Sequence, residues 1–169
     1  MKEIKVGLVG FGFMGTTHWG VYKDMMGVKV VALADVDAAK RKGDISKVVG
    51  NIGGGDNSKP IDLRGVTVYS DALQLIREAD VDIVDICVPT SDHAKLAVAA
   101  LAAGRHVFCE KPLCRTAAEA RKIVAAAKKA KGSFNVGLCV RAWPEYRAAY
   151  EYFKSGKAGK MLSATFKRI

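Results

Sequence analysis

Apolar and amphipathic stretches alternate along the chain, with short polar turns between them. The apolar runs predict short β-strands, and their nearly continuous apolar character is typical of strands covered on both faces. We expect strands at residues 4–9, 28–34, 66–69, 83–88, 106–109 and 135–140. The other stretches predict helices that end near residue 26, begin near residue 70, and span residues 92–103, 116–132 and 144–155. This alternation predicts an α/β fold, a parallel sheet doubly wound by helices.

Local signals mark the ends of two of these helices. Ser91 is placed to cap the start of the earlier one, and Gly104 to end it. Thr116 and Glu119 have the spacing of a capping box at the start of the later one, which Gly132 is expected to close. These signals support the helix assignments independently of the apolar pattern.

Two segments depart from the alternation. Residues 50–60 contain too many glycines for a helix or a strand and predict a long surface loop. Residues 161–166 alternate like a strand, but no later segment is present to pair with them, and an isolated strand needs a partner. We therefore expect one domain over residues 1–140. Residues 141–169 are expected to be a linker helix and the first strand of a second α/β domain that the chain does not contain.

A glycine-rich hexapeptide, GFGFMG, stands at the first strand-to-helix junction and fits the pattern G-x-G-x-x-G. Gly10 permits a tight turn, Gly12 lets the backbone approach a pyrophosphate, and Gly15 lets helix and strand pack closely. The N-terminus of the helix is then free to hold the phosphates. In this setting the hexapeptide predicts a Rossmann-type dinucleotide-binding fold. His18, one turn into the helix, is expected to pack or to form hydrogen bonds rather than to catalyse.

An acidic residue, Asp35, ends the second expected strand, twenty residues after Gly15. A carboxylate there suits the two ribose hydroxyls of NAD and repels the 2′-phosphate of NADP, so NAD is the predicted cofactor. Lys40 and Arg41 follow closely, which leaves some tolerance of NADP open. The alternative interpretation is that the glycines only form a turn and Asp35 caps the next helix.

Two polar segments follow neighbouring strands at the edge where ligands of open parallel sheets bind. Residues 89–93 come after the strand at 83–88, and Glu110, Lys111 and Pro112 come after the strand at 106–109. Both segments should therefore border the nicotinamide of a cofactor bound at the glycine turn. There Lys111 is placed to take the proton of an alcohol while hydride leaves its carbon. Pro112 fixes the turn that aims it.

The net charge of +10 raises nucleic acid as a partner, but the basic residues are scattered. The densest group decorates one alanine-rich helix at 116–132, without aromatic side chains for base stacking. A solvated helix face explains these charges, so no nucleic-acid partner is predicted. No apolar run approaches the length of a membrane helix, so no membrane association is predicted either.

Four cysteines, at positions 87, 109, 114 and 139, form no C-x-x-C pair, so no metal site is predicted. Cys87, Cys109 and Cys139 fall on apolar, strand-like segments, where a free cysteine behaves as a small hydrophobe. The N-terminus has glycines and Glu3 where a signal peptide would be apolar. Reduced thiols and this N-terminus predict a cytoplasmic protein.

The runs GLVGFGFMGTTH, VDIVDICVPTSDHAKLAVAALAAGRHVFCEKPL and VGLCVRAWPEY, together with Asp35, resemble the Gfo/Idh/MocA family. This family is named for glucose–fructose oxidoreductase and inositol dehydrogenase. Its members are nicotinamide-dependent oxidoreductases that act mostly on sugars, inositols and related polyols. The resemblance covers nearly all of the chain, and the Glu-Lys-Pro tripeptide after a strand is its most specific mark.

The resemblance also implies roles for individual residues. Lys111 would assist proton transfer and contact the nicotinamide region, and Glu110 would hold Lys111 in place. Arg141 matches a family segment beside the active site. The residues implied to bind the cofactor are Gly10, Phe11, Gly12, Phe13, Met14, Gly15, Asp35, Pro89, Thr90, His93, Glu110, Lys111 and Arg141.

Members of the family carry a second α/β domain, and this chain is expected to stop at its first strand. That domain supplies the substrate pocket, most of the oligomer interface and, in many members, an Asp and a His for acid–base chemistry. A homo-oligomer is thus expected if the domain is present. The leading hypothesis is an oxidoreductase that transfers hydride between NAD and a sugar, inositol or related polyol. Two alternatives stay open: a catalytically silent NAD-binding module, and an enzyme that uses NAD transiently to cleave glycosidic bonds.

Overall fold

The computed structural model describes residues 3–50 and 59–165. The chain divides into two compact units, residues 1–137 and residues 138–169, and each is described by itself. The division falls close to the boundary expected after residue 140, while the assignment of the second unit to a further domain stays a prediction. Most of the loop expected at 50–60 lies outside the described residues.

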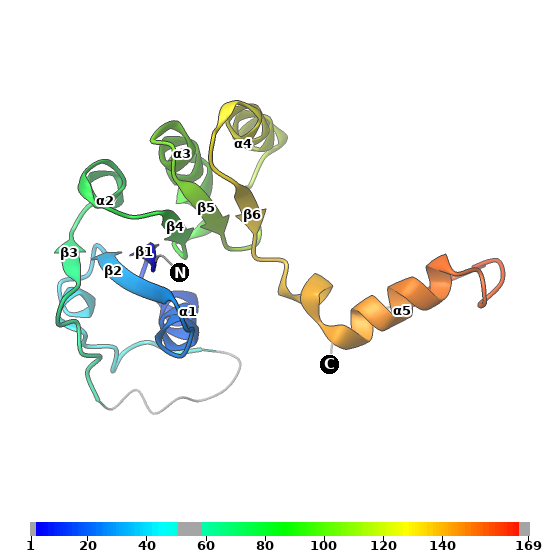
Figure 1. Ribbon diagram of the computed structural model, residues 1–169, viewed down its shortest axis with the longest axis horizontal. Helices are drawn as coiled ribbons and strands as arrows, with labels where there is room; N and C mark the ends of the chain where they lie inside the picture. Colours follow the sequence, from blue (N-terminus) through cyan, green and yellow to red (C-terminus); the bar gives the residue numbers. More distant parts are fainter. Residues whose placement is uncertain (1–2, 51–58, 166–169) are drawn as a thin grey trace. The chain divides into compact units, whose positions relative to one another are not determined.

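Six parallel strands form the sheet of the first unit, in the order β3-β2-β1-β4-β5-β6 (Figure 1). They are β1 (Ile4–Val9), β2 (Val28–Ala34), β3 (Thr67–Tyr69), β4 (Ile83–Ile86), β5 (His106–Cys109) and β6 (Phe134–Val136). The strand order reverses between β1 and β4, from which the chain winds outward in both directions. This order is that of a doubly wound Rossmann fold and confirms the predicted fold class.

Helices cover both faces of this sheet, as the continuous apolar strands require. One face carries α1 (Phe13–Lys23), and the other carries α2 (Ala72–Glu78), α3 (Thr90–Ala102) and α4 (Ala117–Lys129) (Figure 1). A short 3-10 turn that the sequence analysis did not foresee, η1 (Lys40–Lys42), follows β2.

Two apolar clusters hold these layers together. On the α1 face, Val6, Leu8, Phe11 and Leu33 are fully buried, and Trp19 of α1 packs against them. On the opposite face, α2, α3 and α4 bury a larger cluster against the strands, which includes Leu75, Ile76, Val84, Ile86, Leu101 and Val107, with Ala126 and Ala127 of α4 packed against it. Each such side chain stabilises the fold by about 1.5–3 kcal/mol. The core therefore holds the sheet from both faces, and the residues that follow the ends of the strands lie outside it.

Two element boundaries differ from the predicted ones around the central strands. The strand expected to reach residue 88 ends at Ile86, because the chain turns there toward α3. That helix begins at Thr90 with Pro89 as its N-cap, so the prediction of Ser91 as the cap is wrong. The end of α3 is as predicted, since Gly104 follows it with the positive φ of 75° that glycine readily adopts.

The sixth strand also differs, because it covers Phe134–Val136 instead of residues 135–140. Its partner β5 ends at Cys109, so no described strand continues the ladder beyond Val136. Residues 139–142 instead form a 3-10 turn, η2 (Cys139–Ala142), in which Cys139 is exposed. The prediction that Cys139 lies on an apolar strand is therefore wrong.

The capping box at the start of α4 is confirmed. The Thr116 hydroxyl accepts a hydrogen bond from the backbone N–H of Glu119 at 3.2 Å, and the Glu119 carboxylate accepts one from the N–H of Thr116 at 3.1 Å. The helix ends at Lys129, before the predicted Gly132. Gly132 has a different reason to be glycine, because a Cβ there would lie 2.2 Å from the carbonyl oxygen of Arg105.

Thr116→Ala is expected to lower the free energy of unfolding by about 1 kcal/mol, because it removes the acceptor for the Glu119 N–H. Chemical denaturation monitored by circular dichroism measures this loss. Thr116→Ser keeps the hydroxyl and serves as the matched control, which should stay within about 0.5 kcal/mol of the wild type. Equal losses in the two variants would contradict the cap as the cause.

The second unit holds η2 and one helix, α5 (Pro144–Lys154), which begins with a proline as expected. Residues 161–165 form no strand, so the prediction of a strand at 161–166 fails over its described part. The unit offers no described strand to pair with it, and an unpaired strand is unstable in water. Across the described residues, no helix is both long and apolar enough to cross a membrane.

Candidate functional site

The strand register brings four predicted segments to one edge of the sheet. Val9, the last residue of β1, lies opposite Ala34 of β2 and Ile86 of β4, and Ile86 lies opposite Cys109 of β5. The residues that follow these strand ends therefore leave the sheet at one level. They are the glycine turn, Asp35, the turn into α3 and the Glu110–Pro112 segment. In doubly wound folds, ligands bind at this edge, where the strand order reverses.

The first and third glycines of the turn are required by close backbone packing. Gly10 has a φ of 90°, and a Cβ on it would lie 2.6 Å from the carbonyl oxygen of Cys87. A Cβ on Gly15 would lie 1.9 Å from the carbonyl oxygen of Gly10. No side chain fits at such distances, so these two residues make the tight turn and the close strand–helix contact that the pattern predicts.

The second glycine is different, because it borders open space. No described heavy atom comes within 4 Å of a Cβ built on Gly12, so packing does not explain the absence of a side chain there. Gly12 is also the N-cap of α1, and no side chain of the described residues caps that helix. The first N–H groups of α1, at the positive end of the helix dipole, therefore have no capping side chain among the described residues and suit a phosphate.

Asp35 is held against the glycine turn by two backbone hydrogen bonds. Its Oδ2 accepts from the N–H of Phe11 at 2.6 Å, and its Oδ1 accepts from the N–H of Asp37 at 2.8 Å. The guanidinium of Arg41 donates to the carbonyl oxygens of Asp35 and Val36, both at 2.8 Å. The carboxylate of Asp35 is therefore fixed at the end of β2, and the positive charge of Arg41 is held nearby by the carbonyl oxygens of residues 35 and 36.

His93 joins the two loops at the other side of this edge. Its imidazole is 1% exposed, with Nε2 at 2.9 Å from the carbonyl oxygen of Val88 and Nδ1 at 2.8 Å from that of Pro112. The predicted place of His93 is along the path of the cofactor, together with Pro89 and Thr90. In the structure its two hydrogen bonds connect the turn before α3 to the Glu-Lys-Pro segment. Its contact with a dinucleotide stays a prediction.

The Glu-Lys-Pro segment combines a buried carboxylate with an exposed ammonium group. Glu110 is 6% exposed, and its Oε2 accepts a hydrogen bond from the backbone N–H of Lys111 at 3.0 Å, while the Lys111 side chain is exposed. Gly137 makes room for this carboxylate, since a Cβ there would lie 2.4 Å from Oε1. Glu110 thus holds the Lys111 backbone at the edge of the sheet, and the Lys111–Pro112 peptide bond is cis.

A buried polar cluster that the sequence analysis missed lies behind this segment. Asp85 of β4 is fully buried, and its Oδ2 lies 2.8 Å from Nδ1 of His18 and accepts from the Tyr22 hydroxyl at 3.0 Å. Nε2 of His18 faces Oε1 of Glu110 at 3.5 Å. The Cys87 thiol completes the cluster, 3.3 Å from Nδ1 of His18. An acid in the middle of the apolar run VDIVDICV was the only sequence signal of it.

The cluster changes the acid–base behaviour of its members. Burial lowers the pKa of His18, but the hydrogen bond and charge of Asp85 and the charge of Glu110 outweigh burial, so the pKa is raised above 6.5. Burial, assisted by the Asp85 charge, raises the pKa of Tyr22 and of the Cys87 thiol far above their usual values. Both therefore stay neutral donors toward Asp85.

The same side chains have a spacing that a metal ion could bridge, because ligand atoms of His18, Asp85 and Cys87 lie within 4.8 Å of one another. Mutual hydrogen bonds already account for this spacing. We therefore interpret the group as a hydrogen-bonded cluster.

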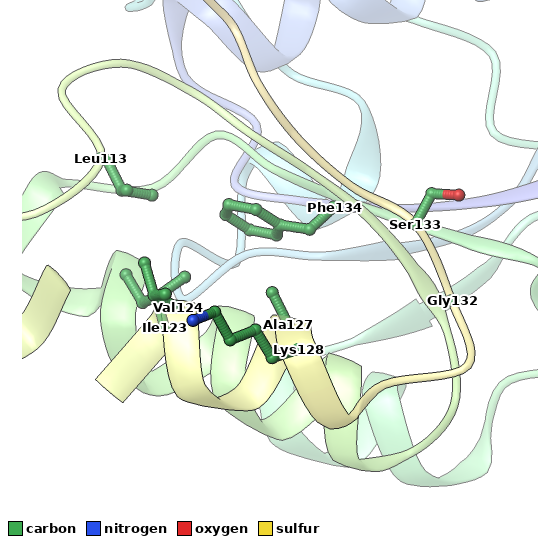
Figure 2. Close-up of a pocket in the computed structure, with 8 residues that line it drawn as sticks. All are labelled: Leu113, Ile123, Val124, Ala127, Lys128, Gly132, Ser133 and Phe134. Carbon is green, nitrogen blue, oxygen red and sulfur yellow. The ribbon is translucent and has the colours of Figure 1, made fainter. Parts of the chain in front are cut away.

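A separate pocket of about 420 Å³ lies between α4 and the start of β6 (Figure 2). Its lining is mostly apolar, with Leu113, Ile123, Val124 and Phe134 facing the space and Lys128 beside it. Because the start of a parallel strand lies away from the carboxyl-end edge, this pocket is not part of the candidate site.

Arg141 lies in η2 of the second unit, and its predicted role stays a prediction.

Three features define this unit as a dinucleotide-binding Rossmann domain. They are the glycine turn, the fixed carboxylate of Asp35 and the uncapped N-terminus of α1. Comparison with protein families agrees, because residues 4–138 match the model of the oxidoreductase family Gfo/Idh/MocA, NAD-binding Rossmann fold. The chain belongs to this family. The resemblance stated from the sequence is thereby confirmed, and so is NAD as the cofactor of the domain.

Relatives of known activity match nearly the whole chain. It is 32% identical to levoglucosan dehydrogenase of Pseudarthrobacter phenanthrenivorans, with 96% of this chain and 40% of that protein aligned. It is also 32% identical to inositol 2-dehydrogenase of Salmonella typhimurium, over 94% of this chain and 44% of that protein. The chain therefore spans less than half the length of these relatives.

Solved structures give the same result. Apo scyllo-inositol dehydrogenase of Lactobacillus casei superposes with a TM-score of 0.78 at 26% identity, over 94% of this chain and 44% of that one. The same enzyme with bound NAD(H) and scyllo-inositol superposes with a TM-score of 0.73 at 27% identity, over 94% of this chain and 43% of that one.

Proposed function

We propose that the chain is the cofactor-binding part of an NAD-dependent oxidoreductase, which transfers hydride between NAD and an inositol, a sugar or a related polyol. The observation that carries the proposal is the position of Lys111, whose backbone Glu110 holds at the same sheet edge as the glycine turn and Asp35. Membership in an oxidoreductase family supports it, as do relatives named inositol and levoglucosan dehydrogenases.

Each residue at the edge then has one task. The N–H groups at the start of α1 bind the pyrophosphate beside Gly12, and the Asp35 carboxylate accepts hydrogen bonds from the ribose hydroxyls. When bound, NAD supplies the hydride acceptor. The Lys111 side chain, as the uncharged amine, takes the proton of the reacting hydroxyl at Nζ and becomes an ammonium group. Pro89 and Thr90 border the place between these groups.

The remaining tasks fall to parts of the relatives that this chain does not match. We propose that a second α/β domain supplies the substrate pocket, further acid–base groups and the contacts of a homo-oligomer, because more than half of each relative lies outside the matched region. Arg141 would lie beside the substrate. Cytoplasmic localisation is the natural setting for four free cysteines, which reducing compartments maintain.

Calorimetric titration of the chain with NAD, with NADP as the comparison, tests the cofactor site. We expect NAD to bind more tightly than NADP. Gly12→Ala should weaken NAD binding at least about tenfold, or about 1.4 kcal/mol, because the added methyl group enters the space that the phosphates need. Stability should change little, since nothing described lies within 4 Å of that methyl group.

Gly20→Ala is the matched control, because Gly20 lies on the same helix and a Cβ there also meets no described atom within 4 Å. It should leave NAD affinity unchanged. Equal affinity for NAD in Gly12→Ala and the wild type would place the dinucleotide elsewhere. In a longer protein that contains this chain, net formation of NADH with inositol would support oxidation, whereas cleavage of a glycoside without net NADH would overturn it.

A further inference from the structure

His18 lies between two carboxylates that come from different strands. Its Nδ1 is 2.8 Å from Oδ2 of Asp85 in β4, and its Nε2 is 3.5 Å from Oε1 of Glu110 beyond β5. The side chain of His18 is only 15% exposed, that of Asp85 is fully buried, and that of Glu110 is 8% exposed. The edge of Phe108 of β5 packs against the imidazole, with ring centroids 5.7 Å apart. The histidine is therefore fixed with one nitrogen toward each acid.

Counting protons shows which form of the histidine this arrangement requires. A carboxylate only accepts hydrogen bonds, and a neutral imidazole carries a single N–H. One of the two carboxylates would then face a nitrogen lone pair. The imidazolium has two N–H groups, donates toward both acids, and places one positive charge between two negative ones. Because uncompensated buried charge is costly, the protonated form suits the site.

The groups that face His18 from neighbouring elements agree with this assignment. Asp85 approaches it from β4, Cys87 from just after β4, Glu110 from beyond β5, and Tyr22 from α1 itself. Tyr22 and Cys87 donate to Asp85 as neutral groups. The charges in contact with His18 are thus two carboxylates, and these outweigh its burial and raise its pKa above 6.5.

The carboxylate of Glu110 connects His18 to the Lys111 segment at the edge of the sheet. Oε1 faces His18, while Oε2 accepts the backbone N–H of Lys111. We propose that His18, as an imidazolium between Asp85 and Glu110, is a positioning residue that fixes Glu110 and through it the Lys111 segment. This inference rests on the proposed function in one respect, the role of Lys111 as proton acceptor. The contacts of His18 and Glu110 do not depend on that function.

The sign of the pH effect follows from the direction of the shift. Because the folded-state pKa of His18 lies above its unfolded value, its stabilising contribution is fully present below pH 6.5. It is lost as the pH rises through the folded-state pKa. Above that point two carboxylates face a neutral ring, and the hold on Glu110 weakens. The Lys111 backbone should report this change, because its N–H donates to Glu110.

Nuclear magnetic resonance of the isotopically labelled chain tests the proposal without cofactor or substrate. We expect the His18 ring to titrate with a midpoint above 6.5, and the Lys111 amide to shift with the same midpoint. Asp85→Asn should lower the proton affinity of His18 about tenfold or more, because it removes the nearer charge. His18→Gln should abolish the shift of the Lys111 amide. His106→Gln is the matched control, since His106 lies at the exposed start of β5 and should leave that shift unchanged.

Either of two results would overturn the proposal. One is a His18 midpoint at or below 6.5 in the wild type. The other is a Lys111 amide whose titration persists with an unchanged midpoint in His18→Gln. If His18→Gln does not fold, the wild type still tests the proposal. Equal midpoints for the His18 ring and the Lys111 amide support it, and different midpoints overturn it. Because no NAD is present, failure of this coupling is distinguishable from failure of NAD binding in the calorimetric titration.

Discussion

Gly15→Ala is expected to lower the free energy of unfolding by about 3 kcal/mol or more, and the melting temperature by about 6–12 °C. The reason is steric, because a Cβ on Gly15 would lie 1.9 Å from the carbonyl oxygen of Gly10. The oxygen belongs to the backbone and the Cβ is bonded directly to it, so neither atom can move away without separating β1 from α1. Chemical and thermal denaturation followed by circular dichroism measure the loss.

The control for this variant lies one and a half turns along the same helix. Gly20 meets no described atom within 4 Å of an added Cβ, and alanine is a better helix former than glycine by about 1 kcal/mol. Gly20→Ala should therefore stabilise the chain slightly. If Gly15→Ala proved as stable as the wild type, α1 would not pack against the turn as described.

Asp35→Asn is expected to reduce the preference for NAD over NADP about 100-fold, equivalent to about 2.7 kcal/mol. In the proposed site, the carboxylate held at the end of β2 would repel the 2′-phosphate of NADP and accept hydrogen bonds from the ribose hydroxyls of NAD. The amide has no charge, and Arg41, tethered to the carbonyls of residues 35 and 36, then attracts the phosphate without opposition. Asparagine keeps one acceptor oxygen for the N–H of Phe11, so the turn should stay folded.

Calorimetric titration of each variant with both dinucleotides measures this preference. Asp37→Asn is the matched control, because it removes the same charge from an exposed residue two positions further along the chain. Its preference should stay within about threefold of the wild type, or about 0.65 kcal/mol. Equal changes in Asp35→Asn and Asp37→Asn would mean that the general negative charge of this loop sets the preference, and not the fixed carboxylate.

Much of the fold follows from local patterns in the sequence. β1, β2 and β5 have the predicted bounds, because each is an apolar run that ends at a glycine or a charged residue. The predictions fail where the presence of a neighbouring strand determines whether a segment forms a strand. β6 stops at Val136 because β5 gives it no further partner, and residues 161–165 form no strand for the same reason. Sequence periodicity indicates which segments can be strands, but pairing determines which of them are.

The glycine turn and Asp35 could be predicted from the sequence, whereas the cluster around Asp85 could not. The glycine turn and Asp35 form a local pattern with fixed spacing, so the sequence was sufficient to place them together. The cluster joins Asp85 to His18 and Tyr22, which lie 67 and 63 positions earlier in the chain, and no spacing rule connects an acid to side chains so distant. His93 is a predicted site residue, but its sequence position does not reveal which groups its ring contacts. Both of its ring nitrogens meet backbone oxygens that only the folded loops bring together.

The bonds of His93 also affect the thermodynamics of ligand binding. Free loops must lose conformational entropy when a ligand orders them, which weakens binding by about 0.5–1.5 kcal/mol for each mobile side chain that becomes fixed. Here one buried ring joins the loop after β4 to the loop after β5, so folding itself orders both of them. If a dinucleotide binds at this edge as proposed, these two loops lose little further entropy, and more of the contact energy contributes to affinity.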